Sequence, residues 1–282
     1  METISYEYEG ALYVNLTNRC DCACVFCLRH NGHKGSIYAD DLWLEHEPTR
    51  QEALDNLLSR DYSKYRELVF CGFGEPMYRT DDILWLVDEL KKRVSNLPPV
   101  RINTNGHANL FLGRDVTPEL AGRIDTISIS LNGSTPEEYC AVTKPRDGVK
   151  AWDAMLDFAR RCREYVPHVV MTIVDKDKTP EDVERCRKLC EELGVTLRIR
   201  AERMWTVVAV EDNGPGIPPE KRGRIFEPFF TSKNTNYNWG MGLYYVRKIV
   251  QSHLGKLRLE SREGQGASFL IMLPVYDPRR KE

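Results

Sequence analysis

Four cysteines lie within the segment "NRCDCACVFC", residues 18–27. Three of them, Cys20, Cys24 and Cys27, follow the pattern C-x3-C-x2-C directly after an apolar run. A short loop with this spacing can place three thiolates around one corner of a 4Fe–4S cluster, and the fourth iron then has no protein ligand. A small molecule can bind that open iron, whereas a cluster with four protein ligands only transfers electrons. We interpret Cys22 as a bystander, because it does not fit the spacing.

The loop alone leaves two other interpretations open. A structural zinc ion would need a fourth cysteine or histidine in range, and Cys22, His30 or His33 could supply it. The thiols could also be free and buried. The motifs that follow along the chain favour the cluster over zinc.

Polar motifs end three of the later apolar runs: "CGFGEP" (71–76), "NTNG" (103–106) and "SISLNG" (128–133). If these runs are parallel strands, their carboxyl ends lie on the same edge of the sheet as the cysteine loop. Glycine in the first motif permits a close backbone approach. The residues of these motifs that could contact a bound small molecule are Gly74, Glu75, Asn105, Ser130 and Asn132.

The cysteine loop and the strand-end motifs together resemble the radical S-adenosylmethionine superfamily. In that family the amino and carboxylate groups of S-adenosylmethionine chelate the open iron, and one electron passed to the sulfonium gives a 5′-deoxyadenosyl radical. The resemblance implies that Cys20, Cys24 and Cys27 hold the cluster. It also implies an electron donor such as flavodoxin or ferredoxin, and a substrate that remains unknown.

The resemblance extends to residues that contact the cofactor. Phe26, before the last cysteine, matches the family residue that lies against the adenine. The stretch 73–76, Phe-Gly-Glu-Pro, replaces a G-G-E-P-type motif, with Phe73 in place of the first glycine. Carbonyls near Gly74 and the Glu75 carboxylate could accept from the methionine ammonium. Three further residues are placed to bond the ribose hydroxyls and the carboxylate: Asn105, Ser130 and Asn132.

A narrower resemblance covers about residues 11–200. The stretches "LYVNLTNRC", "VFCGFGEP", "RINTNGHANL" and "GRDVTPELAG" are similar to the TatD-associated radical SAM proteins. Members of this group lie beside TatD-type metal-dependent nucleases, and the resemblance does not supply their own substrate. The superfamily implies a partial (β/α)6 barrel.

The elements that must position these motifs alternate along the chain. The predicted strands are 11–17, 67–73, 100–104, 126–131, 168–174 and 196–202, and the predicted helices include 48–61, 81–93, 148–165 and one that begins after Thr179. Six strands that alternate with helices predict an α/β fold with a parallel sheet. On the last strand Arg198 and Arg200 share one face, which points into the barrel mouth or to solvent. In the first case an anionic substrate group could meet Arg200.

The regular alternation of predicted strands and helices ends near residue 203, and a second set of motifs follows. "EDNGPGIP" (211–218), "FEPFFTSK" (226–233) and "WGMGL" (239–243) resemble three boxes of histidine-kinase-type ATPase domains. By that resemblance Asp212 would accept from the adenine amino group and Lys233 would face phosphate. The glycines would allow tight turns or offer amides at a helix N-terminus. They are Gly214, Gly216, Gly240 and Gly242.

The resemblance covers only the C-terminal half of such a domain. We therefore predict a radical SAM core over 1–203 and a partial ATPase domain over 204–282. The helix that carries the Mg²⁺-binding Asn in intact domains is absent upstream, so we expect ATP or ADP binding at most, and neither ATPase nor kinase activity. The alternative function is a nucleotide-binding regulatory module fused to a structural barrel. Apolar residues of this half need a cover, from the barrel or from a dimer partner: Phe229, Phe230, Val246 and Ile249.

Composition sets the broad class. Of 282 residues, 41% are hydrophobic and 29% charged, so the chain should bury a core. The net charge of −2 gives no electrostatic case for nucleic acid or an anionic membrane. No apolar run approaches the roughly 18 residues of a membrane span. Nine cysteines without an export signal predict reduced thiols and a cytoplasmic location.

Overall fold

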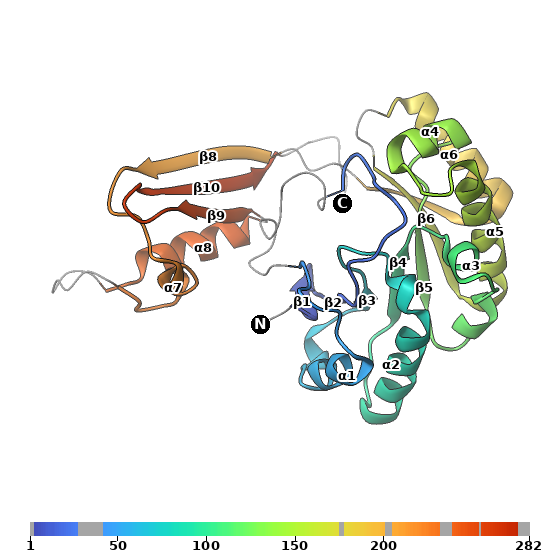
Figure 1. Ribbon diagram of the computed structural model, residues 1–282, viewed down its shortest axis with the longest axis horizontal. Coiled ribbons are helices and arrows are strands. Elements are labelled where there is room, and N and C mark those ends of the chain that lie inside the picture. The colour runs from blue at the N-terminus through green and yellow to red at the C-terminus, as the bar shows by residue number, and fades with distance from the viewer. Residues whose placement is uncertain are drawn as a thin grey trace. The chain divides into compact units, whose positions relative to one another are not determined.

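The computed structural model describes residues 3–27, 42–174, 178–200, 205–231, 239–253 and 255–275. The chain forms two compact units, Met1–Glu202 and Arg203–Glu282. This division falls one residue before the 203/204 boundary proposed from the sequence. Each unit has its own sheet (Figure 1).

The first unit is built on a seven-stranded sheet in which the strands lie in chain order. Its strands are β1 (Ser5–Tyr8), β2 (Ala11–Val14), β3 (Leu68–Phe70), β4 (Val100–Thr104), β5 (Thr126–Ser130), β6 (His168–Val174) and β7 (Thr196–Arg200). The first two strands form an antiparallel hairpin, and every pairing from β2 to β7 is parallel. Six parallel strands joined by crossovers place all their carboxyl ends on one edge. The predicted α/β fold with a parallel sheet is confirmed.

Helices fill the crossovers of this unit. They are α1 (Arg50–Leu58), α2 (Thr80–Arg93), α3 (Ala108–Leu112), α4 (Pro136–Thr143), α5 (Val149–Tyr165) and α6 (Pro180–Leu193), with 3-10 turns η1 (Tyr62–Lys64), η2 (Pro76–Arg79) and η3 (Thr117–Leu120). Thr179 caps α6 with a capping box shared with Asp182, as its position in the sequence predicts. No helix in the described ranges is both long and apolar enough to span a membrane.

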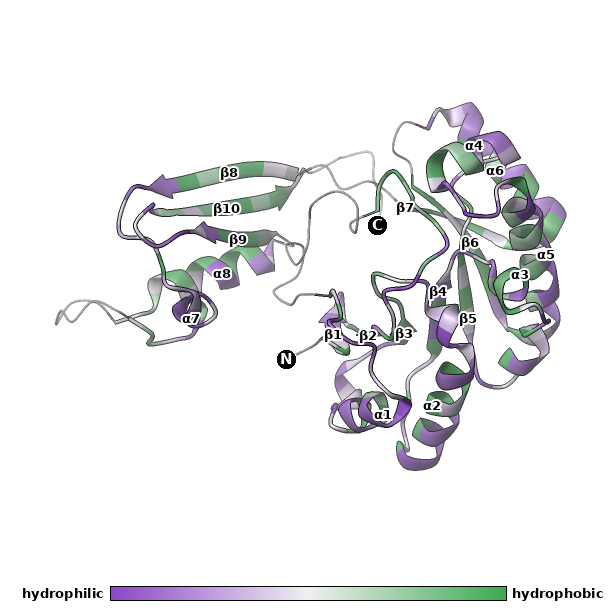
Figure 2. Cartoon of the chain, viewed as in Figure 1, coloured by the Kyte–Doolittle hydropathy of each residue, from purple (hydrophilic) through white to green (hydrophobic). Residues whose placement is uncertain are grey.

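One hydrophobic core joins the helices to the sheet. Ile102, Ile127 and Ile129 on the central strands are fully buried, and so are Leu86 on α2 and Phe158 on α5. These side chains alternate with polar ones along the strands, so one face of the sheet is apolar and the other carries polar residues. Figure 2 shows hydrophilic residues on the outer sides of α2 and α5. The packed face holds the strands in place, while the other face is free to carry chemistry.

The second unit is a three-stranded antiparallel sheet with helices. Its elements are β8 (Trp205–Asp212), α7 (Pro219–Arg222), η4 (Arg224–Phe226), α8 (Gly242–Ser252), β9 (Lys256–Ser261) and β10 (Ala267–Pro274), with strand order β8-β10-β9. Among its described hydrophobic residues, only Val250 and Ala267 are buried. Phe229 and Ile249 are 71% and 58% exposed, so this unit leaves uncovered two of the apolar side chains for which a cover was expected.

A buried chain of polar side chains crosses the first unit. Asp21 Oδ2 lies 2.7 Å from His107 Nδ1, and His107 Nε2 lies 2.6 Å from the Tyr139 hydroxyl. His107 and Tyr139 are fully buried and Asp21 is nearly so. The three residues come from the loop after β2, the start of α3 and the middle of α4. They therefore tie the cysteine-bearing loop to two crossovers.

We expect His107→Ala to lower the free energy of unfolding by about 3–5 kcal/mol, because it leaves a buried carboxylate and a buried hydroxyl without their partner. Urea unfolding followed by circular dichroism measures the loss. His46→Ala is the matched control, since His46 is exposed and its ion pair with Glu52 spans 4.0 Å. Equal effects of the two substitutions would contradict a bracing role for His107.

Candidate functional site

The cysteine loop leaves β2 at the carboxyl edge of the sheet and packs directly on the turn after β3. The Gly74 amide donates to the Thr17 carbonyl at 3.0 Å, and the Glu75 amide donates to the Arg19 carbonyl at 2.7 Å. A Cβ on Gly74 would lie only 2.3 Å from the Thr17 oxygen, so no other residue fits without moving the backbone. This contact fixes the start of the loop relative to β3.

The other side of the loop is bonded to the C-terminal end of α4 and the turn that follows. The Val25 amide donates to the Val142 carbonyl at 2.9 Å, and the Arg146 amide donates to the Asp21 carbonyl at 2.8 Å. The Ala23 amide lies within hydrogen-bonding distance of two carbonyls in the same region. Backbone bonds on both sides therefore hold the loop, although it has no regular secondary structure.

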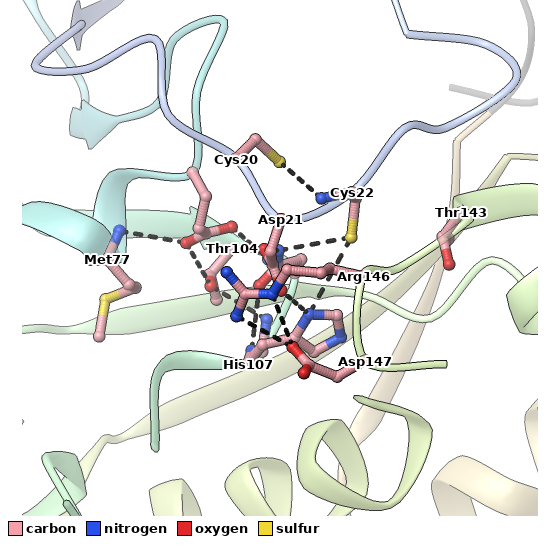
Figure 3. Close-up of polar contacts among 12 residues, drawn as sticks. Cys20, Asp21, Cys22, Met77, Thr104, His107, Thr143, Arg146 and Asp147 are labelled. Atoms are coloured by element: carbon pink, nitrogen blue, oxygen red, sulfur yellow. Dashed lines mark hydrogen bonds and ion pairs between the residues drawn. The ribbon is translucent and has the colours of Figure 1, made fainter. Parts of the chain in front are cut away.

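Figure 3 shows Cys20 and Cys22 on this loop, with the hydrogen bond that joins them. Cys20 Sγ accepts from the Cys22 amide at 3.4 Å, and ligand atoms of Cys20, Asp21 and Cys22 all lie within 4.8 Å of one another. The Cys27 amide donates to the Cys24 carbonyl at 3.0 Å, which closes a turn between these two cysteines. The three cysteines of the C-x3-C-x2-C pattern are half-buried, whereas Cys22 is buried.

Cys22, which was predicted not to be a ligand, is buried among the other thiols of the loop. Hydrogen bonds to Cys20 and Cys24, and then burial, raise the pKa of the Cys22 thiol. The hydrogen bond from Cys22 lowers the pKa of the Cys24 thiol, which favours its thiolate. The side-chain amide of Asn105 donates to Cys22 Sγ at 3.6 Å from the opposite side. Cys22 therefore forms hydrogen bonds with Cys20 and Cys24 within the loop. His30 and His33, the other candidates for a fourth zinc ligand, lie outside the described residues.

Glu75 is turned into the protein and joins the β3 and β4 ends. Its carboxylate accepts from the Thr104 hydroxyl at 2.7 Å, the Asn105 amide at 2.7 Å and the Met77 amide at 3.1 Å. Burial, and then the negative charge of Cys20, raises the pKa of Glu75 to about 8 against these hydrogen bonds. Both carboxylate oxygens are thus engaged within the chain.

Asn105 connects this turn to the cysteine loop. Its side-chain amide donates to Asp21 Oδ1 at 2.6 Å, and its oxygen accepts from the His107 amide at 3.0 Å. Burial would raise the pKa of Asp21, but hydrogen bonds from His107 and Asn105 outweigh that effect and hold the pKa below its usual value. Asn105 therefore links the end of β4 to the cysteine loop.

Sequence reasoning missed three residues of this site: Asp21, His107 and Tyr139. Their partners are 86 and 32 positions apart in the chain, so no local spacing marks them. The only available signal was a histidine directly after the "NTNG" motif. Such a residue is recognised only when the β4 and β5 crossovers are packed together.

The end of β5 carries a free acceptor. Asn132 is buried in a left-handed conformation with φ of 53°, and its Oδ1 has no hydrogen-bond partner among the described residues. Two other predicted cofactor contacts, Ser130 on β5 and Phe26 in the cysteine loop, are half-buried. A buried acceptor without a partner is costly, and a hydroxyl of a bound molecule would satisfy it. Together with the clustered thiols, this acceptor fits a 4Fe–4S cluster and S-adenosylmethionine.

The predicted nucleotide residues of the second unit form two turns. Asp212 Oδ1 accepts from the Gly214 amide at 2.8 Å, and Gly216 has a φ of +73° with the Arg262 carbonyl where a Cβ would be. Gly240 packs in the same way against the backbone of Phe230, and Gly242 begins α8. Lys233 lies outside the described residues.

Comparison with known proteins agrees with both halves of this description. A model of the Radical SAM superfamily matches residues 14–190. A model of histidine kinase-, DNA gyrase B- and HSP90-like ATPases matches residues 171–277. The two matches overlap at β6 and α6, and the structure assigns this overlap to the parallel sheet, because β6 pairs with β5 and β7.

The solved structures that resemble this chain include a protein with bound AdoMet, and the curated relatives include sensor kinases. The structure of native anSMEcpe with bound AdoMet has a TM-score of 0.52 at 16% identity, over 85% of this chain and 57% of that chain. The alginate biosynthesis sensor protein KinB of Pseudomonas aeruginosa is 42% identical over 81 residues, 29% of this chain and 14% of KinB. The sensory kinase SasA of Synechocystis sp. is 45% identical over 71 residues, 24% of this chain and 18% of SasA. This chain thus spans a small part of each kinase.

The ATPase family match covers residues 171–277 and includes β8 to β10, which have a histidine-kinase-like ATPase fold. The superfamily match begins in the strand before the cysteine loop and continues through most of the parallel sheet. It covers more than half of the chain, and the likeness to anSMEcpe supports the same fold. The chain belongs to the radical SAM superfamily.

Proposed function

We propose that the first unit is a radical SAM enzyme that binds a 4Fe–4S cluster through Cys20, Cys24 and Cys27 and cleaves S-adenosylmethionine reductively. The observation that carries the proposal is the braced cysteine loop beside the Gly74 turn, at the carboxyl edge of the parallel sheet. When bound, the cluster supplies one electron to the sulfonium, which yields methionine and a 5′-deoxyadenosyl radical.

The chain's own residues bind and orient S-adenosylmethionine. The carbonyls around Gly74 accept from the ammonium of the methionine moiety, and Asn132 Oδ1 accepts from a ribose hydroxyl. Phe26, half-buried beside the last cysteine, lies against the adenine. Asn105 and Glu75, the other predicted contacts at these strand ends, also hold the loop in place. A one-electron donor such as flavodoxin or ferredoxin supplies the reducing equivalent.

Cys24→Ala should abolish 5′-deoxyadenosine formation, a loss of more than about a hundredfold, because two thiolates hold the cluster poorly. The measurement is anaerobic incubation of the reconstituted enzyme with S-adenosylmethionine and dithionite, together with iron and sulfide analysis. The product should be absent and the iron content low.

Cys22→Ala is the matched control for that substitution. It removes a buried thiol two residues from both Cys20 and Cys24 but leaves all three thiols of the pattern, so iron content and product should stay close to the wild type. Formation of 5′-deoxyadenosine at the wild-type level by the Cys24→Ala variant would contradict the assignment of Cys24 as a ligand. Zinc without iron in the wild-type protein would instead favour a structural metal site.

We infer a second function for the second unit, nucleotide binding without hydrolysis. The supporting observation is that Asp212, Gly214 and Gly216 form one tight turn, as in the motif they resemble. Among the described residues before β8, the segments 168–174 and 180–193 belong to the parallel sheet and its crossover. They provide no equivalent of the Asn-bearing helix, so hydrolysis is not part of this proposal.

ADP should bind the full chain saturably, and Asp212→Ala should weaken that binding by about tenfold because a hydrogen-bonding carboxylate is lost. Isothermal titration measures both affinities. Glu220→Ala, an exposed carboxylate on α7, is the control and should leave the affinity unchanged. A wild-type protein without saturable ADP binding would rule out this second function.

A further inference from the structure

Three arginines lie on the polar face of the barrel sheet, and we refer to Arg101, Arg198 and Arg200 as the arginine cluster. The register pairs Thr172 with Arg198, and Val174 with Arg200. Arg198 Nη2 donates to the Ser128 hydroxyl at 3.0 Å, which places its side chain across β6 on the same face as β5 polar residues. Neighbouring Leu197 is part of the hydrophobic core on the opposite face.

The described residues supply this cluster with little negative charge. Arg101 Nη2 lies 3.0 Å from a Glu67 carboxylate oxygen, but its buried Nε has no hydrogen-bond partner among the described residues. Arg198 bonds only a neutral hydroxyl, and within the described ranges Arg200 makes no ion pair. The whole chain has a net charge of −2. Among the described residues, positive charge therefore exceeds negative charge at this face.

Arg198 and Arg200 keep exposed surface on β7, and polar side chains lie around them. Packing of the protein around the two β7 guanidinium groups lowers the pKa of Arg198 and of Arg200, and the positive charge of Arg101 and Arg200 lowers that of Arg198 further. Arg200 also lies near Cys71 and Tyr13, from β3 and β2. The Asn103 side-chain oxygen on β4 is buried without a partner among the described residues.

Arg200 is the last residue of β7 and lies at the carboxyl edge of the sheet, whereas Arg101 is the second residue of β4. Cys71 comes three residues before Gly74, and its pKa is raised by burial while Arg200 and Arg101 act against that effect. The candidate cofactor contacts lie at the ends of β3 to β5. Arg198 and Arg200 lie on β7, two strands beyond β5. Arg200 therefore lies near the turn after β3 without being part of the cofactor motifs.

We propose that Arg198 and Arg200 bind an anionic group, a carboxylate or a phosphate, of the substrate, and that Arg101 adds to the positive potential there. This inference rests on the proposed function of the first unit and names the chemical class of its substrate. Guanidinium groups suit such anions because their donors match two anion oxygens at once.

The test uses the full chain loaded with its cluster and S-adenosylmethionine, so that the open iron is already occupied. Isothermal titration at fixed ionic strength uses inorganic phosphate, succinate and the neutral succinamide as probes. Phosphate or succinate should bind saturably and succinamide should not. The preferred probe then distinguishes a phosphate from a carboxylate substrate.

Substitutions locate the binding. Arg198→Gln and Arg200→Gln should each weaken the preferred anion by about tenfold, because one charged donor group is lost. Arg160→Gln is the control, since Arg160 is exposed on α5 and has no ion pair among the described residues. It should leave anion binding unchanged. Unchanged iron content in every variant shows that each one folds.

Two results would overturn the inference. One is wild-type protein that binds neither anion, or binds it equally well in the Arg198→Gln and Arg200→Gln variants. The other is a weaker affinity for S-adenosylmethionine in those variants, which would assign the arginines to the cofactor. Failure of the proposed function is a separate observation, namely wild-type protein that takes up no iron or does not bind S-adenosylmethionine.

Discussion

The cysteine loop has no helix or strand of its own, so its shape depends on the backbone on either side of it. On one side it bonds to the Gly74 turn, where two backbones approach too closely for any side chain. On the other it bonds to the end of α4. The position of each thiol thus follows from the packing of the β3 and β5 crossovers. A cluster site of this kind is only as rigid as the barrel that carries it.

Buried polar residues add a second constraint beneath the same loop. Asp21 accepts from both Asn105 and His107, and His107 is in turn bonded to Tyr139. Because every member has a partner, the network can be buried at little cost and restricts the loop to one arrangement. Glu75 fixes the end of β4 in a similar way, because it accepts hydrogen bonds from Thr104 and Asn105. Much of the polar chemistry near the cysteines therefore positions the loop, and the free acceptors are few.

Local patterns in the sequence predicted most of the barrel. Runs of β-branched residues located six parallel strands, and the stretches 100–104 and 168–174 match the observed strands residue for residue. The hairpin strand β1 and helix α4 were not predicted, since a four-residue strand and a short helix leave weak local patterns. The cysteines and strand-end motifs were found by their spacing. The role of Glu75 as an internal acceptor and the burial of Cys22 depend on long-range packing, which spacing does not report.

The second unit shows how a motif can be complete while its fold is partial. Its glycine turns have the close contacts that their sequence implies, yet only two of its described hydrophobic residues are buried. The matching family model starts at residue 171, but in this chain the residues that follow form β6 and α6 of the first unit. A segment can belong to only one sheet, so the barrel retains it and the ATPase-like unit begins at β8.

The central claim is that three thiolates leave one iron open to S-adenosylmethionine. Electron paramagnetic resonance of the dithionite-reduced wild-type protein, recorded before and after S-adenosylmethionine is added, tests it most directly. The account predicts a reduced 4Fe–4S signal whose g-values shift when the compound binds the cluster. A cluster signal that stays the same at saturating S-adenosylmethionine would contradict it, because it would mean that all four iron atoms already have their ligands.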